Sequence, residues 1–162
     1  MKLKFKKLHP DAILPRYATN GSACFDLHAI DVNGISIAEA DVLQKHGHTD
    51  HISTVSKNRA LTFNTGLAFE VPANHVLLIF SRSGHGFNNS VSLANSVGVV
   101  DSDYRGEVMV KLRADDQGAL PVKSGDRIAQ AMILPIPTVE LVEADVLSDT
   151  ERGTDGFGST GS

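Results

Sequence analysis

The densest polar chemistry in the sequence runs from Asn95 to Glu107 (NSVGVVDSDYRGE). An apolar run ends there in Asp101, and a second carboxylate, an aromatic side chain and an arginine follow before Gly106. A carboxylate at the end of a rigid strand can hold a water molecule and take its proton. Taken alone, the same residues also suit a hairpin turn with solvated charges.

The end of the chain, residues 151–162 (ERGTDGFGSTGS), has the composition of a loop that binds phosphate. Glycines let backbone N–H groups approach an anion, and an arginine can fork onto it. No predicted helix or strand follows to anchor the stretch. We therefore expect an arm that stays mobile until a ligand orders it.

Three shorter stretches place polar residues between apolar strands. Ser81-Arg82-Ser83-Gly84 follows an apolar run and could hold an anion, although an ordinary turn is the simpler reading. Asp26 lies between apolar residues, where a carboxylate needs a partner or a metal, or else sits at a turn or strand edge. Gln130 lies inside a predicted strand, so its amide either binds a ligand or belongs to a structural hydrogen-bond network.

A histidine-rich string, His46-Gly47-His48-Thr49-Asp50-His51, matches the zinc-binding string of metallo-β-lactamase-like hydrolases. Its spacing could supply several zinc ligands from one loop. That fold alternates strands with helices and needs further distant ligands, and the sequence predicts neither. An exposed, mobile loop is the preferred interpretation.

Composition predicts one soluble domain. The chain has 162 residues, 41% of them hydrophobic, a net charge of −4 and a pI of about 5.9. This charge argues against a nucleic-acid polymer or an anionic membrane as partner. Cys24 is the sole cysteine, which fits a reducing compartment. Without a signal-like or membrane-length apolar run, we expect a cytoplasmic protein.

The predicted elements are mostly strands. Residues 61–71 alternate apolar and polar side chains with period two. Further strands are predicted over 2–8, 76–80, 106–114 and 127–134, with a weaker one over 138–142, and residues 35–46 fit either a short helix or an irregular segment. Many short strands separated by Gly and Pro predict an all-β sandwich or barrel.

Taken in order, these pieces resemble the trimeric dUTPase family. Five motifs carry the resemblance, and they span residues 22 to 161: Ser22–Ala29, Arg82–Gly84, Asn95–Gly106, Gly125–Gln130 and the tail from Arg152 to Gly161. The resemblance implies a jelly-roll-like β-barrel subunit over 1–150, with an insertion near 33–58. It also implies a mobile arm over 151–162 that closes the active site, and a homotrimer with sites shared among its chains.

The resemblance further implies a reaction: Mg²⁺-dependent hydrolysis of dUTP to dUMP and pyrophosphate, which keeps uracil out of DNA and supplies dUMP. Asp101 would activate the attacking water, and Asp26 would hold waters of the Mg²⁺. The other roles implied are nucleoside binding by Asn95, Gly98, Val99, Val100, Tyr104, Met109 and Phe157, and phosphate binding by Arg82, Ser83, Gly84, Gln130, Arg152, Gly158, Ser159 and Thr160.

Some residues depart from the family pattern. Cys24 and Asp155 stand where glycine is usual, Ser81 replaces a proline and His85 replaces a common leucine. An extra carboxylate such as Asp155 should weaken triphosphate binding unless it points outward.

Two other functions remain open. One is a dCTP deaminase of the same fold, with Glu107 as its general base. The other is a regulatory role in which a protein partner binds the segment 33–58.

Overall fold

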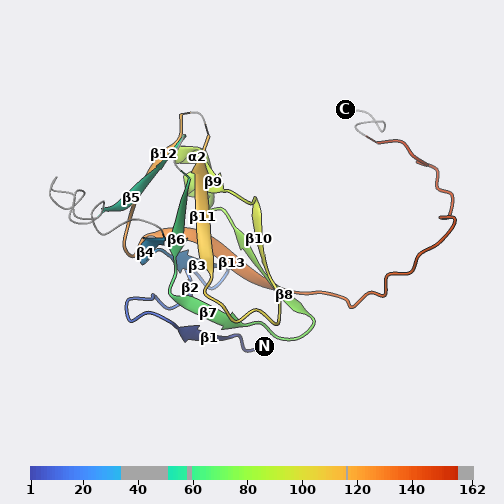
Figure 1. Cartoon of the computed structure of the whole chain (residues 1–162), viewed down its shortest axis with the longest axis horizontal. Coiled ribbons are helices and arrows are strands. Elements are labelled where there is room, and N and C mark those ends of the chain that lie inside the picture. The colour runs from blue at the N-terminus through green and yellow to red at the C-terminus, as the bar shows by residue number, and fades with distance from the viewer. Residues whose placement is uncertain (34–50, 58–59, 116, 157–162) are drawn as a thin grey trace.

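The computed structural model describes residues 1–33, 51–57, 60–115 and 117–156 (Figure 1). Strands dominate this part of the chain, as the sequence predicts, and one short helix lies among them. In chain order the elements are β1 (Lys4–Lys7), β2 (Arg16–Tyr17), β3 (Phe25–His28), β4 (Asp31–Asn33), β5 (His51–Ser56), β6 (Leu61–Asn64), β7 (Leu67–Glu70), β8 (His75–Phe80), α2 (Ser83–Asn89), β9 (Val91–Leu93), β10 (Val97–Val100), β11 (Met109–Ala114), β12 (Ala119–Lys123) and β13 (Arg127–Pro135).

Two larger sheets form the body of the subunit. One has the order β10-β8-β13-β3-β2 and the other β4-β6-β11-β9, and the pairs β1-β7 and β12-β5 complete the arrangement. All the recorded pairings are antiparallel. The all-β, jelly-roll-like class is therefore confirmed. Within the described residues the ladders remain separate sheets and do not close into one barrel.

Apolar side chains from both sheets fill one core. In β11, Val110, Leu112 and Ala114 are buried while the residues between them are exposed, because successive side chains of a strand point to opposite faces. The largest fully buried side chains include Phe63, Phe69, Leu27, Leu67 and Leu77. Burial of these side chains from strands distant in sequence joins the two sheets.

The predicted strand over 61–71 is broken in two at Thr65 and Gly66. Gly66 has φ +67°, which favours glycine, and a Cβ there would lie 2.7 Å from Ile30 Cδ1 and 2.8 Å from Ala12 Cβ. Thr65 is buried, and its hydroxyl donates to Val108 O at 2.6 Å. The period-two pattern was correct, but it could not reveal this bend.

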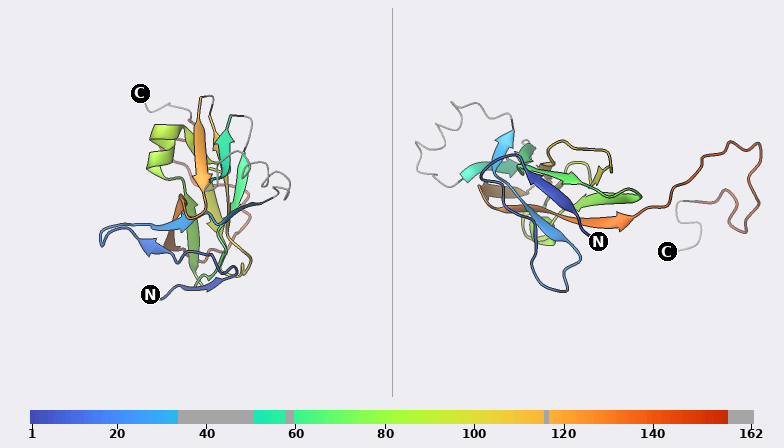
Figure 2. Two further views of the ribbon diagram at one scale, coloured as in Figure 1. Left: turned by 90° about the vertical axis from the view of Figure 1, so that its left-hand side faces the viewer. Right: turned by 90° about the horizontal axis from the view of Figure 1, so that it is seen from below.

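The weak strand expected over 138–142 does not form, so that prediction was wrong. The chain after β13 instead runs away from the body as an extended segment (Figure 2). Six large apolar side chains there are exposed, and Leu141 is 92% exposed: Ile136, Val139, Leu141, Val142, Val146 and Leu147. No strand in the described part of the chain pairs with this segment, which explains why an apolar run did not become a strand.

Residues 34–50, which hold the possible helix and most of the histidine string, lie outside the described residues. The end of the segment 33–58 forms β5, which pairs with β12. In the ranges that the structure describes, no helix is long and apolar enough to cross a membrane.

Candidate active site

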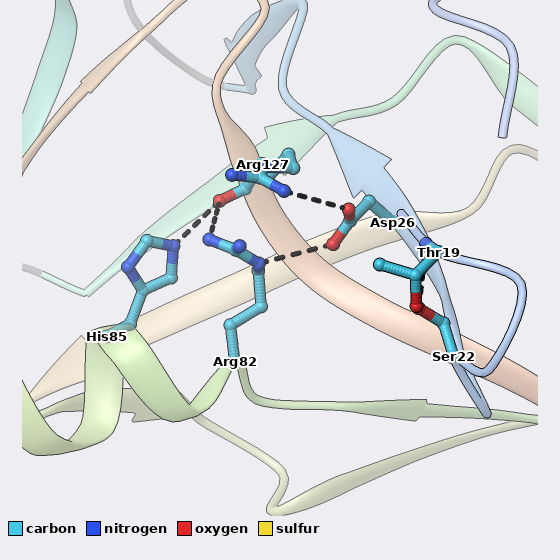
Figure 3. A network of polar contacts seen from close by, with 6 residues as sticks. All are labelled: Thr19, Ser22, Asp26, Arg82, His85 and Arg127. Atoms are coloured by element: carbon cyan, nitrogen blue, oxygen red, sulfur yellow. Dashed lines mark hydrogen bonds and ion pairs between the residues drawn. The ribbon is translucent and has the colours of Figure 1, made fainter. Parts of the chain in front are cut away.

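An ionic cluster on the outer face of the β10-β8-β13-β3-β2 sheet consists of Asp26, Arg82, His85 and Arg127 (Figure 3). Arg82 Nε lies 3.3 Å from Asp26 Oδ1, and Arg127 Nη1 lies 3.3 Å from Asp26 Oδ2. The Asp26 side chain is only 15% exposed. Two guanidinium groups therefore pair with this largely buried carboxylate. The cluster keeps a net positive charge next to Ser83 and Gly84.

A β-bulge brings Arg127 to this face. The β13–β3 register shifts between Arg127 and Ala129, so that Ile128 and Ala129 are both buried while Arg127 is exposed. A regular strand would have turned Arg127 to the opposite face from Gln130. The bulge instead puts Arg127, Gln130 and Asp26 on one face.

His85 fixes the start of β13 from the helix side. Its Nε2 lies 2.7 Å from Arg127 O, and Arg82 Nη1 donates to the same oxygen at 3.4 Å. A carbonyl oxygen only accepts, so Nε2 carries the proton in this contact. The departure from leucine at this position thus adds a polar contact within the cluster.

Gln130 supports the loop that carries Arg82. Its Nε2 donates to Ser81 O at 3.0 Å, while the Ser81 hydroxyl accepts from Leu93 N at 2.8 Å. One N–H of the Gln130 amide remains for a phosphate oxygen. Ser83 and Gly84 begin α2 and are exposed.

Burial lowers the pKa of His28, which lies on the same face of β3 as Asp26, and the nearby Asp26 charge opposes this only in part. His28 Nδ1 is buried, and no described residue offers it a hydrogen bond. A neutral His28 adds no positive charge to the cluster at neutral pH. Burial, and secondarily the Asp26 charge, raises the pKa of the Cys24 thiol, so that it stays protonated.

The donor set suits a magnesium ion that arrives with a triphosphate. Among the described residues no three His, Cys, Asp or Glu side chains gather as a metal site. Asp26 offers one carboxylate with lone pairs beyond its two arginine contacts. Mg²⁺ commonly uses one or two carboxylates together with substrate phosphates and waters, so the residues present fit that mode.

A pocket of about 360 Å³ brings together three of the predicted nucleoside residues, Asn95, Gly98 and Met109. Its wall also includes Ile79, which pairs with Gly98 across the β10–β8 ladder. A Cβ at position 98 would lie 3.0 Å from Ile79 Cβ. Glycine at this position keeps the pocket open beside the β10 backbone. Val99 and Val100 continue the same strand toward Asp101.

Asp101 follows β10 and is exposed in a turn. Tyr104 N donates to Asp101 O at 3.2 Å, and the Tyr104 hydroxyl donates to Glu107 O at 2.9 Å. Asp101 and Tyr104 thus lie on one turn at the far end of the strand that lines the pocket. This is the arrangement that the sequence predicted for a water-activating carboxylate.

Among the described residues, the ionic cluster and the wall of the nucleoside pocket lie on different faces of the sheet. Gln130 pairs with both Asp26 and Phe80, so these side chains share the outer face of the sheet. Ile79, on the wall of the pocket, is a buried core residue and points to the other face. The cluster and the pocket are therefore two separate candidate half-sites.

The arm is described only as far as residue 156. Arg152 Nε donates to Asp155 O at 2.9 Å, which leaves the Asp155 carboxylate out of that contact. Phe157, Gly158, Ser159 and Thr160 lie outside the described residues, so their roles stay predictions.

Sequence reasoning missed three residues of these clusters. Arg127 was quoted only as part of a motif, His85 only as a departure from leucine, and Glu107 only as a candidate base. Arg127 lies three residues before Gln130, a spacing that in a regular strand puts two side chains on opposite faces. The bulge that cancels this rule has no signature in the sequence.

Comparison with known proteins agrees with this fold and these motifs. The dUTPase family model matches residues 48–161. A deoxyuridine 5'-triphosphate nucleotidohydrolase from Nautilia profundicola is 42% identical over 161 residues, which cover 99% of each chain. A protein of the same name from Helicobacter pylori is 35% identical over 99% of this chain and 97% of its own.

A solved structure, Staphylococcus bacteriophage 80alpha dUTPase with dUPNHPP, superposes with a TM-score of 0.80 at 22% identity and covers 99% of each chain. At this identity the match shows the fold. The matches to the relatives extend over nearly the whole of both chains. By sequence and by fold, the chain belongs to the dUTPase family.

Proposed function

We propose that this chain hydrolyses dUTP to dUMP and pyrophosphate. The observation that carries the proposal is the β10 strand, which lines a pocket at Gly98 and ends in Asp101. Uracil in this pocket would pair with backbone groups of β10 and with Asn95. The methyl group of thymine would not fit, and cytosine would present a donor and an acceptor in exchanged positions.

In the proposed mechanism, the Asp101 carboxylate orients a water and takes one of its protons as the oxygen attacks the α-phosphorus. The bond from the α-phosphorus to the bridging oxygen breaks, and pyrophosphate leaves with that oxygen. Tyr104 packs beneath the deoxyribose and leaves no room for a 2′-hydroxyl. Its hydrogen bond to Glu107 O holds the ring in place for this role.

Arg82, Ser83, Gly84 and Gln130 are proposed to bind the phosphates. Magnesium bound to the triphosphate would neutralise phosphate charge and hold the chain of phosphates for in-line attack. Asp26 is the side chain proposed to hold waters of that ion. Arg152 and residues 157–160 would close over the nucleotide and exclude bulk water.

The separation of the two half-sites supports a homotrimer with shared active sites. The residues proposed to bind phosphate lie on the outer face of the sheet, whereas Ile79, on the wall of the nucleoside pocket, faces the core. In the proposed trimer a second copy supplies the ionic cluster, and another chain covers the exposed apolar side chains of the extended segment after β13. The trimer itself is the arrangement implied by the family.

The competing deaminase reaction would require Glu107 as a general base near the pyrimidine. The Glu107 carboxylate instead accepts a hydrogen bond from Gly66 N at 2.7 Å. That contact favours hydrolysis over deamination.

Pyrophosphate release from dUTP, dCTP, dTTP and UTP, each with Mg²⁺, tests the proposal. We expect turnover with dUTP and little with the other three nucleotides. Ammonia release from dCTP would favour the deaminase, and no turnover of dUTP would refute the hydrolase.

A further inference from the structure

Glu107 links the turn that carries Asp101 and Tyr104 to a fixed point of the core. Its carboxylate Oε1 accepts from Gly66 N at 2.7 Å, and its main-chain oxygen accepts from the Tyr104 hydroxyl at 2.9 Å. One residue thus contacts both the nucleoside-binding aromatic ring and the bend between β6 and β7.

The Gly66 end of this link is rigid. The bend at Gly66 lies against Ile30 and Ala12 without room for a Cβ. Leu8 N donates to Gly66 O at 2.7 Å. The buried Thr65 hydroxyl also bonds Val108 O, one residue beyond Glu107. A hydrogen bond to Gly66 N therefore fixes Glu107 relative to the core.

At the Tyr104 end, the ring is partly exposed but its phenol packs against the Gly106 backbone. A Cβ on Gly106 would lie 2.4 Å from the Tyr104 Oη, so the phenol lies directly against the Gly106 backbone. Arg105 Nη1 donates to Ser102 O at 2.7 Å and to Tyr104 O at 2.9 Å. These bonds hold the shape of the turn, but they do not fix its place relative to the core.

We propose that Glu107 is a positioning residue for discrimination between deoxyribose and ribose. Its carboxylate holds the Gly106–Glu107 backbone, and that backbone holds the Tyr104 ring where a 2′-hydroxyl would otherwise fit. This inference rests on the proposed dUTP hydrolysis. Glu107 does not touch the substrate in this role, and it takes no part in proton transfer.

Two variants test the proposal: Glu107→Ala, which removes the acceptor, and Glu107→Gln, whose amide oxygen can still accept from Gly66 N. We expect Glu107→Ala to lower kcat/KM for dUTP roughly tenfold and to lower the dUTP-to-UTP ratio of kcat/KM by a similar factor. For Glu107→Gln, kcat/KM for dUTP and the dUTP-to-UTP ratio should each stay within about threefold of the wild-type value.

The matched control is Glu70→Ala, which removes a carboxylate from the exposed ion pair with Lys4. It should leave the dUTP-to-UTP ratio unchanged. If Glu107→Ala lowers the thermal midpoint but keeps the wild-type ratio, the residue is structural only and the proposal is wrong. The proposal is also wrong if Glu107→Gln lowers the dUTP-to-UTP ratio as far as Glu107→Ala does.

A readout without turnover separates this inference from the proposed function. The chain has two tyrosines and no tryptophan, so a Tyr17→Phe background leaves Tyr104 as the sole tyrosine emitter. Glu107→Ala should increase acrylamide quenching and lower the anisotropy of Tyr104, and unchanged values would overturn the proposal. A wild type that binds no dUTP would refute only the proposed function.

Discussion

Asp101 and Asp103 lie in one exposed turn, but only Asp101 directly ends the strand that lines the nucleoside pocket. Replacing Asp101 with Ala should lower kcat by about 10²–10⁴-fold, because the attacking water loses its base. Binding of dUpNHpp should persist, as calorimetry would show. Asp103→Ala is the matched control and should retain most activity. Equal loss in both variants would remove the special role of Asp101.

Arg127 belongs to the motif Gly125–Gln130, but the motif did not predict its place in the ionic cluster. Arg127→Gln should raise KM for dUTP by about tenfold with a smaller change in kcat, because a phosphate-facing positive charge and a partner of Asp26 are lost. Arg113→Gln removes an exposed arginine from β11 and serves as control. Steady-state kinetics at fixed ionic strength compare the KM values of the two variants. A normal KM for Arg127→Gln would contradict a role of Arg127 in phosphate binding.

The candidate residues were named from the family resemblance, because the residues alone suited ordinary turns as well, and their roles stay predictions. Their partners could not be predicted. The contact of Glu107 with Gly66 joins residues 41 positions apart, and the Asp26–Arg127 contact joins residues 101 apart. No local pattern encodes such pairs, since they depend on how the sheets pack.

At the scale of elements, the patterns of apolar and polar side chains predicted several of the strands but not their irregularities. The bulge in β13 and the bend at Gly66 both interrupt a period-two pattern that looks continuous in the sequence. The strand expected over 138–142 failed for a related reason. A strand needs a hydrogen-bonding neighbour, and composition alone does not supply one.

The Gly66 bend predicts a large loss of stability on substitution. Gly66→Ala should lower the free energy of unfolding by about 2–4 kcal/mol, from left-handed strain together with overpacking against Ile30 and Ala12. Gly125→Ala is the control: φ is +88°, but the nearest atom to its added Cβ would be 3.6 Å away. It should cost about 1–2 kcal/mol from strain alone. Urea denaturation measures the free energy of unfolding of both variants. Equal losses would exclude overpacking of the added Cβ as a cause.

At the scale of the whole molecule, the chain after β13 has two parts with different expected roles. Truncation after Glu151 should spare folding and trimer formation but abolish most turnover, since the proposed closing arm is lost. Truncation after Pro135 should also remove the exposed apolar side chains and weaken the trimer. Light scattering with dUTP kinetics tests both. Normal kcat/KM in the shorter truncation would refute the role of the arm.

The opposite placement of the two half-sites has a consequence for mixtures of chains. Asp101→Ala damages only the pocket side of a subunit, and Arg82→Ala damages only the ionic cluster. Each variant alone should be inactive. Unfolded together and refolded, they should form mixed trimers in which an intact pocket from one chain faces an intact cluster from another. Recovery of dUTP hydrolysis in the mixture would be intersubunit complementation, and a mixture as inactive as its parents would mean that each chain builds its own site.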